Sequence, residues 1–289
     1  MKKFVKGLFA AGLALSLAAC SSNSASSDDS SADDANASSD ELTVIKVGAT
    51  TTPHGQILEE AKEAMKEKGY DLQITEFSDY PPINPAVSDG SLDANYFQHL
   101  PYLEGYDADS NYKSGDDGYL ISVGAIHYEP FGVYSETLKD IAEIKDGDKI
   151  AVPNDATNEA RALLLLQELG LLTLSEDADL NTATIKDITE NPKNLEIIEL
   201  PADQIAAQLP DLAAGVINGN YAMAGDVTDL RIAYEPEDSD AAKTYQNIIA
   251  VKESNKDNEG IKTLVEVLKL DEIKNYITEN FGTSVVPAE

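Results

Sequence analysis

Strand patterns and helix patterns alternate along this chain beyond residue 42, and this alternation limits the fold more than any other feature. Residues 44–47 are rich in β-branched side chains and predict a strand. Residues 56–68 carry apolar side chains at helical spacing, and residues 70–77 predict a second strand. Such a β-α-β unit favours a parallel sheet with a right-handed crossover. The chain therefore predicts an α/β fold.

A second series of strands and helices is predicted after residue 148. The two series, 43–127 and 148–222, predict two α/β lobes with a cleft between them, joined by long extended stretches. Ligands of open α/β sheets bind beyond the carboxyl ends of strands, so residues that follow strands are the first candidates for a site. The further predicted segments are a short helix before Gly90 and a strand after it, an extended stretch at 118–135, strands at 148–154, 195–201 and 247–254, helices at 158–170, 202–209, 259–270 and 271–282, and a strand running into a turn at 212–222.

The first 42 residues predict export and anchoring. Residues 1–19 combine a basic start with a short apolar run, which is typical of a secretory signal peptide and too short to span a membrane of about 30 Å. The run ends in Leu-Ala-Ala-Cys, which resembles a bacterial lipobox and predicts lipidation of Cys20. Residues 20–42 are Ser-, Ala- and Asp-rich and predict a disordered tether.

Charge and motifs exclude several functions. The formal net charge is −31, with 52 acidic against 21 basic residues, so nucleic acid would be repelled. The sequence contains three histidines, one cysteine and none of the common hydrolase, P-loop or dinucleotide-binding motifs. Residues 107–118 resemble a calcium loop only in part, because Tyr112 and Gly118 replace the required Gly and Glu. We therefore predict no enzyme, no metal and no cofactor.

The stretch "NYFQHLPYLEGY", residues 95–106, gathers four aromatic rings and a histidine. Its polarity and its proline argue against an ordinary core helix. Because it follows a predicted strand of a cleft-forming lobe, it is a candidate pocket wall. Tyr96 should point away from Phe97 in an extended strand, so we assign Tyr96 and Tyr106 to packing or to the surface.

Several longer stretches are similar to one known family. They are "VGATTTPHGQILE", "DYPPINPAVSDGSLDANYFQHLPYL", "VPNDATNEARALLLLQELGL", "ENPKNLEIIEL", "VINGNYA" and "YQNIIAV". In this order they cover nearly the whole chain after the tether, and they resemble the NlpA family, the methionine-binding lipoproteins of ABC importers.

The resemblance implies a two-lobed periplasmic-binding-protein fold with two interlobe crossovers, similar to type II. Lobe 1 would comprise residues 43–127 and 248–289, and lobe 2 residues 128–247. The implied function is capture of L-methionine and delivery to an ABC permease. The implied protein is a monomer, anchored to the extracytoplasmic face of the cell membrane through Cys20.

The resemblance also implies roles for polar residues. Arg161 would bind the ligand carboxylate. It is predicted in the first turn of a helix beginning at about Asn158, where a guanidinium can make two charge-assisted hydrogen bonds, aided by the helix N-terminus. The alternative is a surface Arg161 that pairs with Glu159 or another acid. Asn218 and Asn247 would contact the ligand, with Asn158 as a weaker candidate, although each asparagine alone could be a turn residue. Arg231 has no such context and is assigned to the surface.

Four ring positions would form the side-chain pocket. Thioether sulfur packs favourably against aromatic ring edges, so rings suit a methionine side chain. The alternative is that the rings are ordinary core between sheet and helix. The positions that match the family are Tyr80, Phe97, His99 and Tyr102.

Two departures from the family pattern leave the exact ligand open. "DYPPIN" and "VINGNYAMAGDVTDL" differ from the usual family sequences near the predicted cleft. The same scaffold could bind another apolar amino acid or a methionine-containing dipeptide, because one methylene changes binding by only about 1–3 kcal/mol. More distant alternatives are a hydrolytic enzyme and a purely structural lipoprotein.

Overall fold

The computed structural model describes residues 42–236 and 239–288, and every structural statement below refers to these ranges. Residues Asp40–Glu289 form one compact unit. The predicted signal peptide, Cys20 and all of the tether except Leu42 lie outside the described residues. Within these ranges, no helix combines the length and the apolar character that a membrane span requires.

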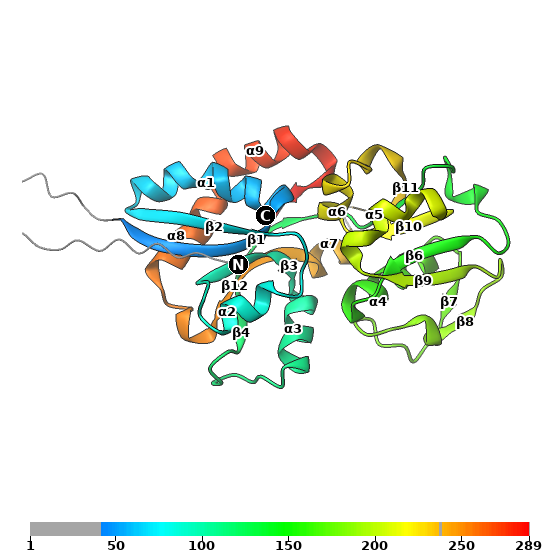
Figure 1. Cartoon of the computed structure of the whole chain (residues 1–289), viewed down its shortest axis with the longest axis horizontal. Helices are drawn as coiled ribbons and strands as arrows, with labels where there is room; N and C mark the ends of the chain where they lie inside the picture. Colours follow the sequence, from blue (N-terminus) through cyan, green and yellow to red (C-terminus); the bar gives the residue numbers. More distant parts are fainter. Residues whose placement is uncertain (1–41, 237–238, 289) are drawn as a thin grey trace, which may run out of the picture. The chain divides into compact units, whose positions relative to one another are not determined.

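A six-stranded mixed sheet contains the first predicted β-α-β unit (Figure 1). Strand β1 pairs in parallel with β2 and with β3. The other three strands, β12, β4 and β13, pair antiparallel to their neighbours. In spatial order the strands are β13 (Val286–Pro287), β4 (Leu120–Tyr128), β12 (Gln246–Lys252), β3 (Ala94–His99), β1 (Thr43–Thr50) and β2 (Tyr70–Phe77).

Helices cover both faces of this sheet. One face packs against α1 (Gln56–Glu67), α8 (Glu259–Leu268) and α9 (Asp271–Phe281) in one apolar cluster. The other packs against α2 (Ile83–Ser88) and α3 (Leu100–Asp109) in a smaller cluster. Because helices cover both faces of the sheet, every residue of the central strand β3 is buried.

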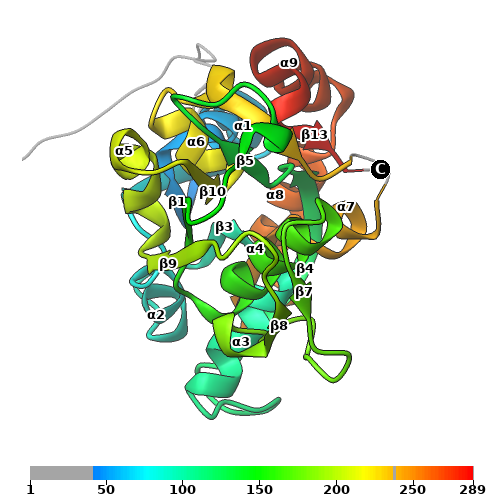
Figure 2. The same cartoon turned by 90° about the vertical axis from the view of Figure 1, so that its right-hand side faces the viewer.

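A five-stranded sheet contains the second series. Along β6, Ile150 and Val152 join the cluster under α4 (Ala156–Glu168), whereas Ala151 joins a cluster with α5 (Ile205–Gln208). The alternation places α4 and α5 on opposite faces, as Figure 2 shows. The strand order is β11 (Arg231–Tyr234), β5 (Gly132–Tyr134), β10 (Ala214–Ile217), β6 (Lys149–Pro153) and β9 (Glu196–Leu200). A small hairpin, β7 (Thr173–Leu174) with β8 (Ile188–Glu190), and the helices α6 (Gly219–Ala224) and α7 (Asp240–Thr244) complete this part.

The chain passes between the two sheets twice. It leaves the six-stranded sheet after β4 and enters the other at β5, and it returns between β11 and β12. This topology and the mixed α/β architecture confirm the predicted two-crossover fold. The predicted lobe borders at 127–128 and 247–248 fall inside β4 and β12, and we propose that the borders follow the two crossovers instead.

Several predicted segments differ from the structure for local reasons. The extended stretch 118–135 is interrupted at Glu129–Phe131, where the chain changes sheets. The part of the stretch 95–106 that follows His99 belongs to the helix α3, and Pro101 does not break this helix, because it lies in the first turn, where its missing N–H is not needed. Residues 212–222 run into the helix α6 rather than a turn, and residues 202–209 form two short helical segments.

The helix that carries Arg161 begins earlier than predicted. Asp155 is its N-cap and accepts a hydrogen bond from the Asn158 backbone at 3.1 Å. Arg161 is therefore the sixth residue of α4 and lies beyond the first turn. The predicted help from the helix N-terminus is wrong, since that effect is confined to the first turn.

A glycine lets α8 pack closely on the six-stranded sheet. A Cβ at Gly260 would overlap Ile45 Cδ1 and lie 2.9 Å from the Tyr70 ring. Ile45 is 2% exposed and part of the main core cluster, so it has little room to move.

We expect Gly260→Ala to lower the free energy of unfolding by about 1–3 kcal/mol, because overpacking forces side chains from their rotamers. Gly105→Ala in α3 is the matched control, because its Cβ would meet Thr157 at an ordinary 3.7 Å. Chemical denaturation of both variants measures the difference. Equal stability of the two variants would contradict close packing at Gly260.

Candidate functional site

A cavity lies between residues contributed by elements of both sheets. All eight residues predicted as ligand contacts line it, so the structure brings together positions spread over 168 residues of sequence, from 80 to 247. The predicted lining residues are Tyr80, Phe97, His99, Tyr102, Asn158, Arg161, Asn218 and Asn247. Their ligand-binding roles remain predictions.

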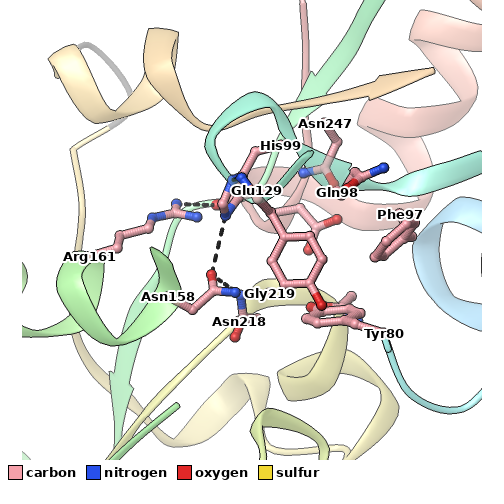
Figure 3. A pocket seen from close by; sticks show the side chains of 12 residues that line it. Tyr80, Phe97, Gln98, His99, Glu129, Asn158, Arg161, Asn218, Gly219 and Asn247 are labelled. Carbon is pink, nitrogen blue, oxygen red and sulfur yellow. Dashed lines mark hydrogen bonds between the residues drawn. The ribbon is translucent and has the colours of Figure 1, made fainter. Parts of the chain in front are cut away.

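Three rings form an apolar wall at one side of the cavity. The Tyr80 ring centroid lies 5.5 Å from Phe97 and 5.7 Å from Tyr102. Tyr80 is fixed because its hydroxyl donates to Asn220 Oδ1 at 2.5 Å. Tyr96 belongs to a different core cluster, which confirms that it points away from Phe97. Figure 3 shows Tyr80 and Phe97 across the pocket from Arg161.

Arg161 is 4% exposed and paired with a carboxylate that the sequence analysis did not identify. Its Nε and Nη2 donate to the two carboxylate oxygens of Glu235 at 2.8 and 2.5 Å. The guanidinium lies 4.3 Å from the Tyr245 ring centroid and 4.7 Å from that of Phe131. Within the described residues, Arg161 hydrogen-bonds only through Nε and Nη2, and its Nη1 remains available to a ligand carboxylate.

Glu129 also contacts Arg161, through its backbone carbonyl at 3.1 Å from Nη2. Glu129 and Glu235 each stand in the tripeptide Tyr-Glu-Pro, and each tripeptide begins a crossover between the sheets. Both glutamates are buried, at 5% and 3% exposure. This repeated tripeptide was the available sequence signal for both residues, and the sequence analysis missed it.

His99, Asn158 and Asn218 form a hydrogen-bonded chain. The Tyr102 backbone donates to His99 Nδ1, so His99 Nε2 carries the proton and donates to Asn158 Oδ1 at 3.2 Å. Asn218 Nδ2 donates to the same oxygen at 2.9 Å. Among the described residues, Asn218 Oδ1 is buried without a hydrogen-bond partner, which leaves one acceptor at the cavity.

A buried cluster of His54, His127 and Glu129 supports the other side of the cavity. His127 Nε2 donates to Glu129 Oε1 at 2.7 Å, and His54 Nε2 lies 3.4 Å from the same oxygen. Tyr96 donates to His127 Nδ1, and Thr50 donates to His54 Nδ1 at 2.7 Å. Each histidine therefore presents an Nε2–H toward acceptors.

Burial fixes the charge of these groups. It lowers the pKa of His54 to about 4 and that of His127 to about 3, so both are neutral at neutral pH. It raises the pKa of the Glu129 carboxyl, and the nearby His54 opposes that increase. Burial and the positive charge of Arg161 lower the pKa of His99 to about 3.

The cluster uses residue types that bind zinc, but its spacing does not fit an ion. Its three ligand atoms lie within 4.8 Å of one another. Two ligands at about 2.0–2.2 Å from a tetrahedral zinc ion are separated by roughly 3.3 Å. The 2.7 Å between His127 Nε2 and Glu129 Oε1 is a direct hydrogen bond instead.

The sequence analysis missed four lining residues. Gln98, Glu129, Gly219 and Asn220 also border the cavity. Gln98, Glu129 and Gly219 are direct neighbours of a predicted or buried residue at the end of β3, β4 or β10, and Asn220 lies two residues after Asn218, so strand ends were the usable signal. Gly219 is required locally, because a Cβ there would lie 2.8 Å from Glu129 Oε2.

Comparisons with known proteins identify the relatives of this chain. Residues 45–289 match the family model described as NlpA lipoprotein. The chain is 41% identical over 246 residues to the methionine-binding lipoprotein MetQ of Bacillus subtilis, covering 84% of this chain and 87% of that protein.

Two solved structures are similar in both sequence and fold. A nutrient-binding protein from Burkholderia cenocepacia bound to methionine is 40% identical, with a TM-score of 0.79, covering 85% of this chain and 100% of that one. A periplasmic substrate-binding protein of an ABC transporter from Coxiella burnetii is 38% identical, with a TM-score of 0.77, covering 84% and 100%.

The neutral histidines make stability depend on pH in a defined direction. The pKa of His127 is about 3 in the folded chain against an ordinary value of 6.5, so the unfolded state binds its proton first as pH falls. The stability linked to His127 is present above pH 6.5 and is lost as pH falls toward 3, at up to about 1.4 kcal/mol per pH unit.

We expect the free energy of unfolding of His127→Gln to fall less steeply than that of the parent chain between pH 7.5 and 5. Glutamine keeps a donor for Glu129 and does not titrate. Urea denaturation at several pH values measures the two slopes. Lys186→Gln, at an exposed position, is the control and should follow the parent chain. Parallel slopes for His127→Gln and the parent would contradict a neutral buried His127.

Proposed function

The chain belongs to the NlpA lipoprotein family, and we propose that it is an extracytoplasmic binding protein for methionine that delivers this ligand to an ABC permease. The observation that carries the proposal is the cavity between the two sheets. It places one buried arginine opposite a wall of three rings, with polar side chains between them. An amino acid with a free carboxylate and an apolar side chain matches this arrangement.

Arg161 would bind the ligand carboxylate. Its pairing with Glu235 holds the guanidinium group in place, and the rings of Phe131 and Tyr245 pack against it, with centroids 4.7 and 4.3 Å from its central carbon. The Nη1 group would then donate to the ligand without any reorganisation of the side chain. Asn247 uses only its Oδ1 in hydrogen bonds to the described residues, so its Nδ2 is a second donor for the carboxylate.

The ring wall would take the ligand side chain. Tyr80, Phe97 and Tyr102 meet at tilted or edge-to-face angles, which exposes ring edges and faces to a thioether. Sulfur–ring contacts contribute about 0.3–1.5 kcal/mol each, in addition to burial of apolar ligand surface. The B. cenocepacia relative is described as bound to methionine, which supports the same ligand class here.

A second cavity, with about 240 Å³ of free space, lies beside the first and shares Tyr80 and Tyr102 with it. If these two rings moved apart, a methionine-containing dipeptide could extend into that space, and the dipeptide is therefore the second candidate ligand.

Anchoring and transport complete the proposal. The lipobox-like sequence supports lipidation of Cys20 and attachment to the extracytoplasmic face of the cell membrane. The relatives described as lipoproteins and as an ABC transporter component support this place and the permease partner. The relatives named here are binding proteins, which supports binding rather than catalysis. We propose that the protein acts as a monomer.

Isothermal titration calorimetry with methionine, leucine, alanine and a glycyl-methionine dipeptide tests the ligand. We expect micromolar or tighter binding of methionine, at least about tenfold weaker binding of leucine and little binding of alanine. Separate titrations with L- and D-methionine define the stereochemical preference. Tighter binding of the dipeptide than of methionine would replace the proposed ligand by the second candidate. Binding of none of these compounds would reject the proposal.

We expect Arg161→Lys to weaken methionine binding by about 100-fold, because lysine cannot pair with Glu235 and the ligand through one planar fork. Arg231→Lys is the matched control, since Arg231 is half-buried on β11 and does not line the cavity. Calorimetry measures affinity, and thermal unfolding verifies that both variants fold. Unchanged affinity in Arg161→Lys would contradict its role in binding the carboxylate.

A further inference from the structure

Glu129 is the buried acid that lines the cavity, and its carboxyl group has no part in the proposed contacts to the ligand carboxylate and side chain. It follows β4 directly, it is 5% exposed, and its side chain reaches the cavity beside His99 and Asn247 (Figure 3). Its backbone carbonyl bonds to Arg161 at 3.1 Å, so one residue stands beside the guanidinium and also presents a carboxylate. The cavity thus contains an acidic side chain and a cationic side chain in close proximity.

We propose that Glu129 recognises the α-ammonium group of the ligand, and that His54 and His127 position its carboxylate for this contact. This inference rests on the proposed function. It defines the ligand class more narrowly, as α-amino acids with a free, protonated amine. Hydroxy acids and N-acylated amino acids would be excluded.

The two histidines hold Glu129 without neutralising it. His127 donates to Oε1 at 2.7 Å, and the His54 Nε2–H lies 3.4 Å from the same oxygen and 2.9 Å from Asn247 Oδ1. The tautomers are set from behind by Tyr96 and Thr50. Because both rings are neutral at neutral pH, they hold the Glu129 carboxyl group as hydrogen-bond donors and place no full positive charge beside it.

The nearest cation is already engaged elsewhere. Both carboxylate oxygens of Glu235 bind Arg161, and Tyr128 and the Phe131 backbone donate to the same acid. The charged or titratable groups near Glu129 are His54, His127, Arg161 and the hydroxyls of Tyr80, Tyr96 and Tyr134. Burial raises the pKa of the Glu129 carboxyl, and His54, the Asn220 backbone N–H and Arg161 oppose that increase. An ammonium group in the cavity would supply the charge-assisted hydrogen bond that this carboxylate lacks.

Two neighbours of Glu129 fit the same interpretation. Asn218 Oδ1 is a buried acceptor without a partner among the described residues, and it borders the same cavity. An ammonium group has three donors and could satisfy both acceptors. Gly219 provides the space for the glutamate, since a Cβ there would lie 2.8 Å from both its Cβ and Oε2.

The test combines two ligands with two proteins. Calorimetry at neutral pH compares L-methionine with its hydroxy-acid analogue, in which a hydroxyl replaces the ammonium group. We expect the parent chain to bind methionine at least about 100-fold more tightly than the analogue, because the analogue leaves a buried charge unpaired. In Glu129→Gln we expect this ratio to fall to about tenfold or less, with the affinity for the analogue kept or increased.

Glu159→Gln is the matched control. Glu159 is also a buried glutamate, at 4% exposure, but it bonds to the Ile185 backbone and does not line the cavity. This variant should keep the ligand ratio of the parent chain. If Glu129→Gln does not fold, Glu129→Asp retains the charge on a shorter side chain, and we expect an intermediate ratio with a folded chain.

The outcomes separate the two proposals. If the parent chain does not bind methionine, the proposed function fails before Glu129 is tested. If the parent binds methionine but does not distinguish the hydroxy acid, ammonium recognition by Glu129 is wrong. A parent-like ratio in folded Glu129→Gln, or in Glu129→Asp where the first variant does not fold, would also overturn it. A loss of the ratio confined to the Glu129 variants supports the inference.

Discussion

The buried ion pair between Arg161 and Glu235 is the interaction on which the rest of the site depends. Arg161 comes from α4 under the five-stranded sheet, Glu235 from the second crossover, and the Glu129 carbonyl from the first. One guanidinium therefore joins the two segments through which the chain passes between its sheets. Removing a single partner would leave a buried charge unpaired, which costs several kcal/mol, so the two crossovers and α4 are fixed relative to one another.

The same pair prepares the arginine for a ligand. A free buried arginine would have to reorient on binding and lose side-chain entropy, whereas Arg161 is held by Glu235 and by the rings of Phe131 and Tyr245. Glu235 does not consume the whole guanidinium, because its fork uses only Nε and Nη2. The proposed carboxylate contact would use the remaining Nη1, and a lysine with one ammonium group could not make both interactions through one planar fork.

Local sequence patterns predicted the elements well where periodicity was strong, as in β2, whose residues 70–77 agree at both ends. They failed where one residue decides the outcome. Pro101 suggested a break but occupies a helix start, and Asp155 moved the start of α4 by acting as its N-cap. The eight site residues were predicted correctly as lining one cavity, because they were taken from the family resemblance and not from local patterns. Glu129 and Glu235 were missed, because their importance comes from contact with Arg161, 32 and 74 residues away in sequence.

The distribution of charge explains how a chain of net charge −31 can bind an anionic group. Exposed carboxylates act through water and salt, which screen them over about 10 Å, whereas the buried groups of the cavity are screened much less. At the cavity the local order of charges matters more than the total. In the proposed complex, Arg161 would face the ligand carboxylate, and Glu129, with two neutral histidines behind it, would face the ammonium group. A zwitterion can satisfy both at once, while a simple anion or a simple cation leaves one of them unpaired.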